Sequence, residues 1–133
     1  MRWRRQDGVA AVEFALLLPL IVTILFATIE FGVAMAKWED YESAAREGAR
    51  FAAVHCAPTS PCDTPSEVWT VVKKASSDFT DTNAPMPATF TVTPLVCTPG
   101  GQVVVSWKQT FQMNVVVKLY QQTRTMRGVF RCE

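Results

Sequence analysis

Cysteine and histidine are the side chains of this 133-residue chain with the widest chemical repertoire. The four cysteines are Cys56, Cys62, Cys97 and Cys132, and the one histidine, His55, stands next to the first of them. A cysteine–histidine pair can act as a nucleophile and its base, but adjacent residues at the end of a predicted helix are better explained as boundary residues. Zinc is an alternative use for the cysteines, although the chain lacks a Cys-x-x-Cys knuckle. We expect disulfides.

The remaining reactive side chains form no catalytic pattern. The sequence has no glycine-rich phosphate loop, no nucleophile elbow and no paired carboxylate motif. Asp63, Glu67, Asp78 and Asp81 are scattered, and we expect them on the solvated surface. With 13 basic and 12 acidic residues the net charge is +1, which argues against a nucleic-acid partner. The sequence predicts no enzyme, no catalytic residue, no metal site, no cofactor and no small-molecule substrate.

An apolar stretch fills the N-terminal part of the chain. Residues 9–36 contain only two charged side chains, Glu13 and Glu30, and residues 14–29 contain none. About 20 such residues cross the hydrocarbon core of a bilayer as a helix. Arginines precede the stretch, and a mixture of lysine and acidic residues follows it. The positive-inside rule therefore predicts a cytoplasmic N-terminus, with everything after about residue 37 outside the membrane.

A cleaved secretory signal is the alternative, with Ala34-Met35-Ala36 as a passable cleavage site. Signal peptides have an apolar region of about 7 to 15 residues. This stretch is longer and helical sequence continues after it, so a membrane anchor is the better interpretation. Pro19 lies inside the run and is expected to kink the helix, which membrane helices tolerate.

Glu13 is an unusual residue for the start of an apolar helix. It could simply lie at the headgroup level near the helix N-terminus, where a negative charge is favourable. The residues before it indicate something more specific. Gly8 is followed by four apolar residues and then Glu13, so a cut after Gly8 would leave the glutamate at the fifth position. This order resembles the start of a type IV prepilin, which has a basic leader, a glycine, four apolar residues and a glutamate.

Several blocks of the sequence together resemble TadE-like proteins, the minor pseudopilins of tight-adherence (Flp) pilus systems. The blocks are Gly8–Leu20, Ile29–Gly32, Ala44–Ala52 and, more weakly, Thr125–Arg127. The sister family TadF has a similar start, and the sequence does not separate the two. Phe14 stands where major Flp pilins usually have tyrosine, and the chain is far longer than a major pilin, which favours a minor component.

The resemblance implies a set of functional residues and partners. A dedicated prepilin peptidase would cut between Gly8 and Val9, and Glu13 would neutralise the freed amino group of a neighbouring subunit. The partners would be other pilins or pseudopilins, the Tad machinery of the inner membrane, and the lipid bilayer. The protein would be a single-pass protein of the bacterial inner membrane with its head outside.

The apolar helix is expected to continue beyond the membrane. One helix face is formed by residues that recur every three to four positions, namely Trp38, Tyr41, Ala45, Gly48 and Ala52. That face either packs on the protein's own sheet or contacts another subunit. We divide the chain into a leader (1–8), a transmembrane and stalk helix (9–54) and an extracytoplasmic α+β head (55–133).

The head is predicted to contain one short helix and about three antiparallel strands. The helix begins near Thr64. The first strand is predicted at Thr89–Thr93, whose residues alternate strictly. A turn at Thr98–Gly101 leads to the returning strand Val103–Trp107, and a last strand, Gln121–Arg131, alternates threonines with bulkier neighbours. Residues 114–118 are expected to form a link or a short strand.

Four cysteines allow three pairings. Cys56 and Cys62 flank a proline-rich loop, which makes a local bridge plausible. Cys97 follows the first predicted strand and Cys132 the last, and these ends meet on one side of a three-stranded meander. We favour Cys56–Cys62 and Cys97–Cys132.

Three functions remain open at this stage. The first is a processed minor pseudopilin that takes part in assembly of a Tad-type pilus. The second is an uncleaved membrane anchor that displays a small binding domain in the periplasm. The third is a sensor or inhibitor domain that partners a membrane enzyme. Only the first requires the Gly8-to-Glu13 pattern.

Overall fold

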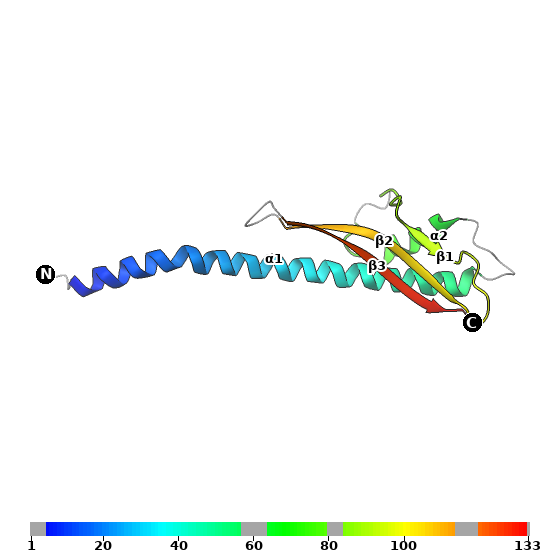
Figure 1. Cartoon of the computed structure of the whole chain (residues 1–133), viewed down its shortest axis with the longest axis horizontal. Helices are drawn as coiled ribbons and strands as arrows, with labels where there is room; N and C mark the ends of the chain where they lie inside the picture. The colour runs from blue at the N-terminus through cyan, green and yellow to red at the C-terminus, as the bar shows by residue number, and fades with distance from the viewer. Residues whose placement is uncertain (1–4, 57–63, 80–83, 114–119, 133) are drawn as a thin grey trace.

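The computed structural model describes residues 5–56, 64–79, 84–113 and 120–132. Within them lie two helices and a three-stranded antiparallel sheet, in the order α1 (Arg5–His55), α2 (Pro65–Ala75), β1 (Thr91–Thr93), β2 (Gln102–Met113) and β3 (Tyr120–Arg131). The C-terminal half of α1 lies inside a small head, and its N-terminal half projects away alone (Figure 1). The predicted α+β fold, a long N-terminal helix with a head of one helix and three strands, is confirmed.

The helix α1 has 51 residues and is about 75 Å long at 1.5 Å per residue. It begins at Arg5, before the predicted start at Val9, because a glycine such as Gly8 weakens a helix by only about 1 kcal/mol and does not end it. Figure 1 shows the axis changing direction in the blue section, which contains Pro19. Threonine hydroxyls in this section bond back to the helix itself, Thr23 Oγ1 donating to the Pro19 carbonyl at 2.7 Å.

The helix α2 is short and amphipathic. It starts with Pro65 at its first position, where the missing N–H costs nothing. Val68, Trp69 and Val72 form its buried stripe, whereas Val71 is half-buried and Ala75 is exposed. Lysines occupy its last turn, where positive charge interacts favourably with the helix dipole.

The strands form a meander with the spatial order β1-β2-β3. Gly100 has φ +81° and the N–H of Gly101 donates to the Thr98 carbonyl at 2.9 Å, as the predicted turn requires. The strands β2 and β3 pair over their whole length, from Gln102 with Arg131 to Met113 with Tyr120. The predicted link at residues 114–118 lies outside the described residues.

Two strand boundaries differ from the prediction by more than one residue. The strand β1 begins at Thr91 rather than Thr89, because the Thr89 hydroxyl, not its backbone, accepts from the Lys108 N–H at 3.1 Å. The strand β2 continues to Met113, six residues beyond the predicted end at Trp107. Its extra residues pair with the first half of β3, which supplies hydrogen bonds that no local apolar alternation indicates.

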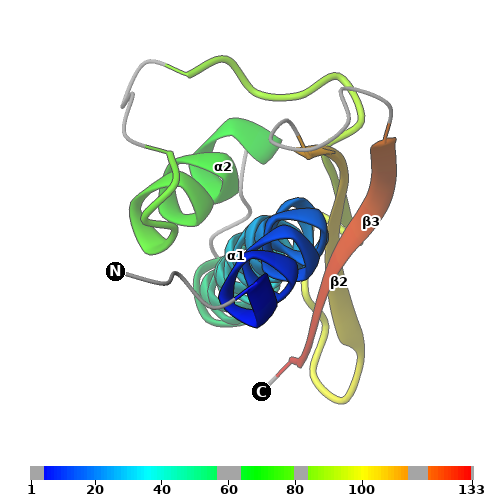
Figure 2. The same cartoon turned by 90° about the vertical axis from the view of Figure 1, so that its left-hand side faces the viewer.

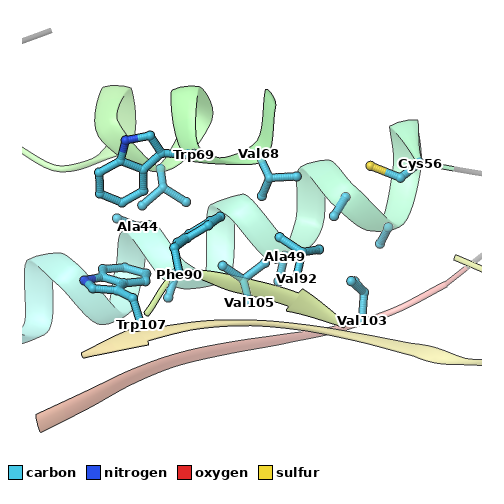
Figure 3. Close-up of a cluster of buried hydrophobic side chains, with 14 of the residues drawn as sticks. Ala44, Ala49, Cys56, Val68, Trp69, Phe90, Val92, Val103, Val105 and Trp107 are labelled. Atoms are coloured by element: carbon cyan, nitrogen blue, oxygen red, sulfur yellow. The ribbon is translucent and has the colours of Figure 1, made fainter. Parts of the chain in front are cut away.

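The core lies between the two helices and one face of the sheet (Figure 2). Val103, Val105 and Trp107 of β2 point toward the helices and are buried (Figure 3). The Trp69 ring of α2 meets the Trp107 ring edge-on, with centroids 6.1 Å apart. Four rings therefore join α2 to the sheet, since Phe90 also contacts both tryptophans and Tyr41 contacts Trp107.

The small-residue face of α1 packs on the protein's own head. Tyr41, Ala45, Gly48 and Ala52 are all buried, together with the neighbouring alanines 44, 49 and 53. A Cβ added at Gly128 of β3 would collide with the backbone of α1 at Ala45 and Arg46. The last turns of α1 thus form the centre of the head, so the core includes residues on both sides of the predicted boundary at residue 55.

Candidate functional site

The residues predicted for processing and assembly lie together on the projecting part of α1. Gly8, Val9 and Glu13 are helical and exposed. Val9 and Glu13 are four residues apart, which is about 6 Å along the axis. The described part of the head packs on α1 well beyond them: Trp38 is the first α1 residue that packs against the core, and Phe26 is the first that lines a cavity beside the head. The carboxylate is therefore accessible to a group from another molecule at the same depth.

The projecting part of α1 is exposed and strongly apolar. Its large hydrophobic side chains from Val9 to Val33 stand in solvent, and the most apolar 18-residue window has a mean hydropathy of 2.5 with none of its residues buried. By length and composition, α1 is able to cross a membrane. In water such a surface would be a severe liability, because monomeric soluble proteins rarely expose contiguous apolar patches above a few hundred Å².

A polar network joins α1 to the segment that follows α2, at the level where α1 leaves the head. Asp78 pairs with Lys37 Nζ at 2.8 Å and accepts a hydrogen bond from the Tyr41 hydroxyl. One turn away, Asp40 Oδ2 accepts from the Ser76 hydroxyl at 2.6 Å and from the Ser77 N–H at 3.0 Å. We call this set, residues 37, 40, 41 and 76–78, the neck network.

The neck network changes the acidity of two of its members. Hydrogen bonds from Lys37 and then from Tyr41 hold the pKa of Asp78 below its ordinary value, against a smaller opposing effect of burial. Burial, and then the hydrogen bond to Asp78, raises the pKa of Tyr41 above its ordinary value. Both residues therefore keep the protonation states that this contact needs at neutral pH, an ionised carboxylate and a protonated phenol.

The sequence-based expectation for Asp78 was wrong. Asp78 is not a solvated surface residue but a partly buried one with two partners from α1. Those partners lie 37 and 41 positions earlier in the chain, so no local pattern reveals them. Glu67 is exposed as expected, and Asp63 and Asp81 lie outside the described residues.

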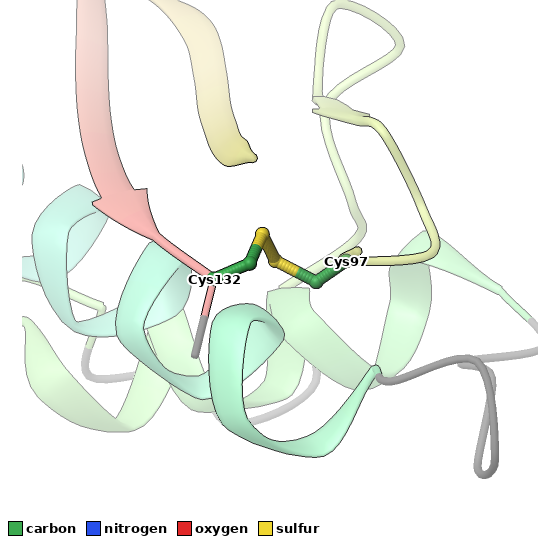
Figure 4. The surroundings of a disulfide bond; sticks show 2 residues. All are labelled: Cys97 and Cys132. Carbon is green, nitrogen blue, oxygen red and sulfur yellow. A yellow bond between two sulfur atoms is a disulfide. The ribbon is translucent and has the colours of Figure 1, made fainter. Parts of the chain in front are cut away.

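The described cysteines, Cys56, Cys97 and Cys132, lie at the opposite end of the head from the neck. Cys97 and Cys132 form a disulfide with their Cα atoms 5.5 Å apart (Figure 4). The Cys97 N–H also donates to the Cys56 carbonyl at 2.7 Å, which fixes the bridge to the end of α1. Cys56 is itself disulfide-bonded, and Cys62, its predicted partner, lies outside the described residues.

The described residues contain no group of three or more histidine, cysteine, aspartate or glutamate side chains able to hold a metal ion. His55 is the last residue of α1, and its ring stacks on Phe51 with centroids 4.3 Å apart. Its Nδ1 lies 3.2 Å from the Phe51 carbonyl. The ring is accounted for by these helix-end contacts, as expected for a boundary residue.

Residues 8–50 match the family model described as TadE-like protein. The matched segment runs from the predicted cleavage residue through the exposed apolar helix and into the buried alanine face. The resemblance inferred from the sequence is confirmed over this segment. No curated protein and no solved structure matches the chain.

Proposed function

We propose that this protein is a minor pseudopilin, processed by a prepilin peptidase, that takes part in the assembly of a Tad/Flp-type pilus for adherence. One observation carries the proposal: the segment that matches the TadE-like family begins at Gly8 and coincides with a helix that projects, exposed and apolar, from a small packed head. A membrane-anchored subunit that can later enter a filament needs both parts. The head would lie outside the bacterial inner membrane.

The geometry around Gly8 is compatible with cleavage before Val9. Gly8 lies in the first turn of α1, which begins at Arg5. The first four N–H groups of a helix have no intrahelical acceptor, so unwinding this turn breaks few hydrogen bonds. A protease that binds its substrate as an extended peptide can therefore obtain the Gly8–Val9 bond without disturbing the head.

Glu13 supplies the charge that the processed end requires. Cleavage creates an α-amino group on Val9, which carries a positive charge at neutral pH. Taking an unpaired charge out of water costs several kcal/mol, and a partner of opposite sign offsets much of that cost. Glu13 of a neighbouring subunit would reach this amine after an axial stagger of about 6 Å.

Intact-mass spectrometry of the protein, produced with and without its prepilin peptidase, tests the processing step. With the peptidase we expect a chain that begins at Val9, and without it the leader remains. Gly8→Leu should keep the leader attached, because the bulky side chain obstructs the peptidase at the cleavage position. An uncleaved wild type in the presence of the peptidase, or a mass that corresponds to cleavage after Ala36, would contradict the proposal and favour an anchor or a signal peptide.

Substitution of Glu13 tests the pairing. Glu13→Gln should be inserted and cleaved normally but should fail to support piliation, and Glu13→Asp should restore it in part because the charge is kept. Glu39→Gln is the matched control, since Glu39 is an exposed glutamate of the same helix beyond the apolar stretch. Normal piliation of a strain whose only copy carries Glu13→Gln would show that the glutamate merely sits among headgroups.

A further inference from the structure

A groove of about 250 Å³ lies between α1 and the far end of the β2–β3 hairpin. On one side it is lined by Phe31, Met35 and Trp38 of α1, and on the other by Phe111, Gln122 and Arg124 of the hairpin. We call it the Arg124 groove. Its end toward the N-terminus of α1 is apolar, and its end toward the head carries the guanidinium and the indole.

The depth of the groove follows from the helix geometry. A bilayer core of about 30 Å takes about 20 helical residues, so a span that starts near Val9 ends near Ile29. The α1 residues of the groove, Phe31 to Trp38, are the next two turns. Tryptophan is enriched at this level of membrane proteins, where the ring meets the headgroups. The groove therefore opens at the plane of the lipid phosphates.

Arg124 is held in place, but no acid in the described part of the chain compensates its charge. Its guanidinium carbon lies 5.7 Å from the centroid of the Trp38 ring. With the oxygen and nitrogen of the Gln122 amide exchanged, which satisfies both groups, the oxygen accepts from Nε at 3.0 Å and from Nη2 at 2.6 Å. No carboxylate among the described residues lies within 4.0 Å of it. Lys37, a cation of α1 at a similar height, is by contrast already paired with the carboxylate of Asp78.

An immobilised guanidinium with free donors is the group that binds phosphate best, since two N–H groups can engage two phosphate oxygens. The apolar side of the groove continues directly into the exposed side chains of the membrane segment. A cation at the phosphate plane above an apolar channel complements an anionic headgroup with an acyl chain below it.

We propose that the Arg124 groove binds one phospholipid of the leaflet next to the head, with the phosphate on Arg124 and an acyl chain along Phe31 and Met35. The lipid would fix the height and tilt of the head above the membrane. The proposal requires that α1 crosses the bilayer, but it does not depend on cleavage or on entry into a pilus.

Native mass spectrometry of the full-length protein in detergent, titrated with phosphatidylglycerol, tests this site. Wild type should retain one phospholipid, and Arg124→Gln should bind it at least 10-fold more weakly. Arg127→Gln is the matched control, because Arg127 is exposed on the same strand and lines no part of the groove. Equal retention by wild type and Arg124→Gln would overturn the proposal.

Three further arms distinguish the occupants. Diacylglycerol, which lacks the phosphate, should bind at least 10-fold more weakly than phosphatidylglycerol, and equal binding would overturn the role of Arg124. Inorganic phosphate should not displace the lipid, and displacement at millimolar concentration would reassign the groove as a simple anion site. A dimer that Arg124→Gln dissociates would mean that a second copy occupies the groove, which also defeats the lipid assignment. Near-ultraviolet circular dichroism verifies that each variant keeps its fold.

Phospholipids brominated in their acyl chains give an independent readout. Trp38 lies in the groove, whereas Trp69 and Trp107 are buried in the head. In a Trp3→Phe background, brominated lipid should quench the Trp38 fraction of the fluorescence, and Arg124→Gln should reduce that quenching. The Trp38→Phe variant shows which fraction of the fluorescence comes from Trp38. Quenching that is the same with and without Arg124 would argue against a bound lipid.

Discussion

Gly128 of β3 makes the most direct test of how the head is built around α1. A Cβ at this position would lie well inside 3.0 Å of the carbonyl carbon and oxygen of Ala45 and of the Arg46 nitrogen. All three are backbone atoms of α1, so no side-chain rotation relieves the collision. Gly128→Ala can be accommodated only if the helix and the strand move apart.

The expected cost follows from two opposing effects. Among the described glycines only Gly100 has a positive φ, so alanine suits the backbone of Gly128. On that ground alone the substitution would stabilise the protein by about 0.4–1 kcal/mol through the unfolded chain. A carbon–oxygen contact needs about 3.3 Å, so α1 must shift by about 1 Å, and such overpacking costs about 1–3 kcal/mol or more. We expect a net loss of about 2 kcal/mol.

Thermal unfolding of the full chain in detergent, followed by near-ultraviolet circular dichroism of Trp69 and Trp107, measures the effect. A loss of 2 kcal/mol should lower the Tm by about 8–16 °C for a domain of this size. Gly32→Ala is the matched control, because a Cβ at that glycine of α1 would meet nothing within 4 Å. If Gly128→Ala melted at or above the wild-type temperature, the proposed contact between β3 and the backbone of α1 would be refuted.

The neck network and the disulfide yield two more predictions. Asp78→Asn should lower the free energy of unfolding by about 1–3 kcal/mol in chemical denaturation, because it removes a charged partner of Lys37 and Tyr41; an unchanged midpoint would contradict this. The pKa of Asp78 is lowered in the folded protein, so the ionised carboxylate stabilises the fold above the usual carboxyl pKa, and this stabilisation is lost as the pH falls through the lowered pKa. The free energy of unfolding of Asp78→Asn should therefore depend less on pH in the acid range. The pKa of Tyr41 is raised, so the pH dependence runs the other way: the stability that protonated Tyr41 contributes should be lost as the pH rises above about 10. The Cys97–Cys132 bridge closes a 35-residue separation, so the double serine variant should lose about 4 kcal/mol, and a melting temperature like that of the wild type would show that the bridge constrains nothing.

The helices and the turn between β1 and β2 could be predicted from sequence because their signals are local, whereas the full length of β2 could not, since it depends on pairing with β3. The apolar run of α1, the stripe Val68–Trp69–Val72 of α2 and the turn at Gly100 each follow from residues within one element. The exact start of β1 could not, since it depends on a hydroxyl of Thr89 that replaces a ladder hydrogen bond.

The residues of the candidate site also differ in whether a local sequence signal indicates them. Gly8 and Glu13 are predicted from their spacing and from the resemblance to TadE-like proteins, because a processing signal is read as a linear peptide, and their roles stay predictions. The neck network was missed, because Asp40 and Asp78 obtain their partners only when the segment after α2 folds back on α1. Arg124 was also missed, since nothing in an alternating strand indicates that one of its cations will lie over Trp38.

The projecting helix presents different chemistry on its different sides, and an ideal helix allows the sides to be compared. At 3.6 residues per turn, the line that starts at Glu13 passes within about one-eighth of a turn of Phe31, Met35 and Trp38. Lys37, which the network engages through Asp78, lies about a third of a turn away from that line. The pairing carboxylate and the Arg124 groove therefore share one side of α1. If Glu13 pairs with a neighbouring subunit as proposed, that subunit would approach along the side that carries the groove, and entry into a filament would compete with retention of the proposed lipid.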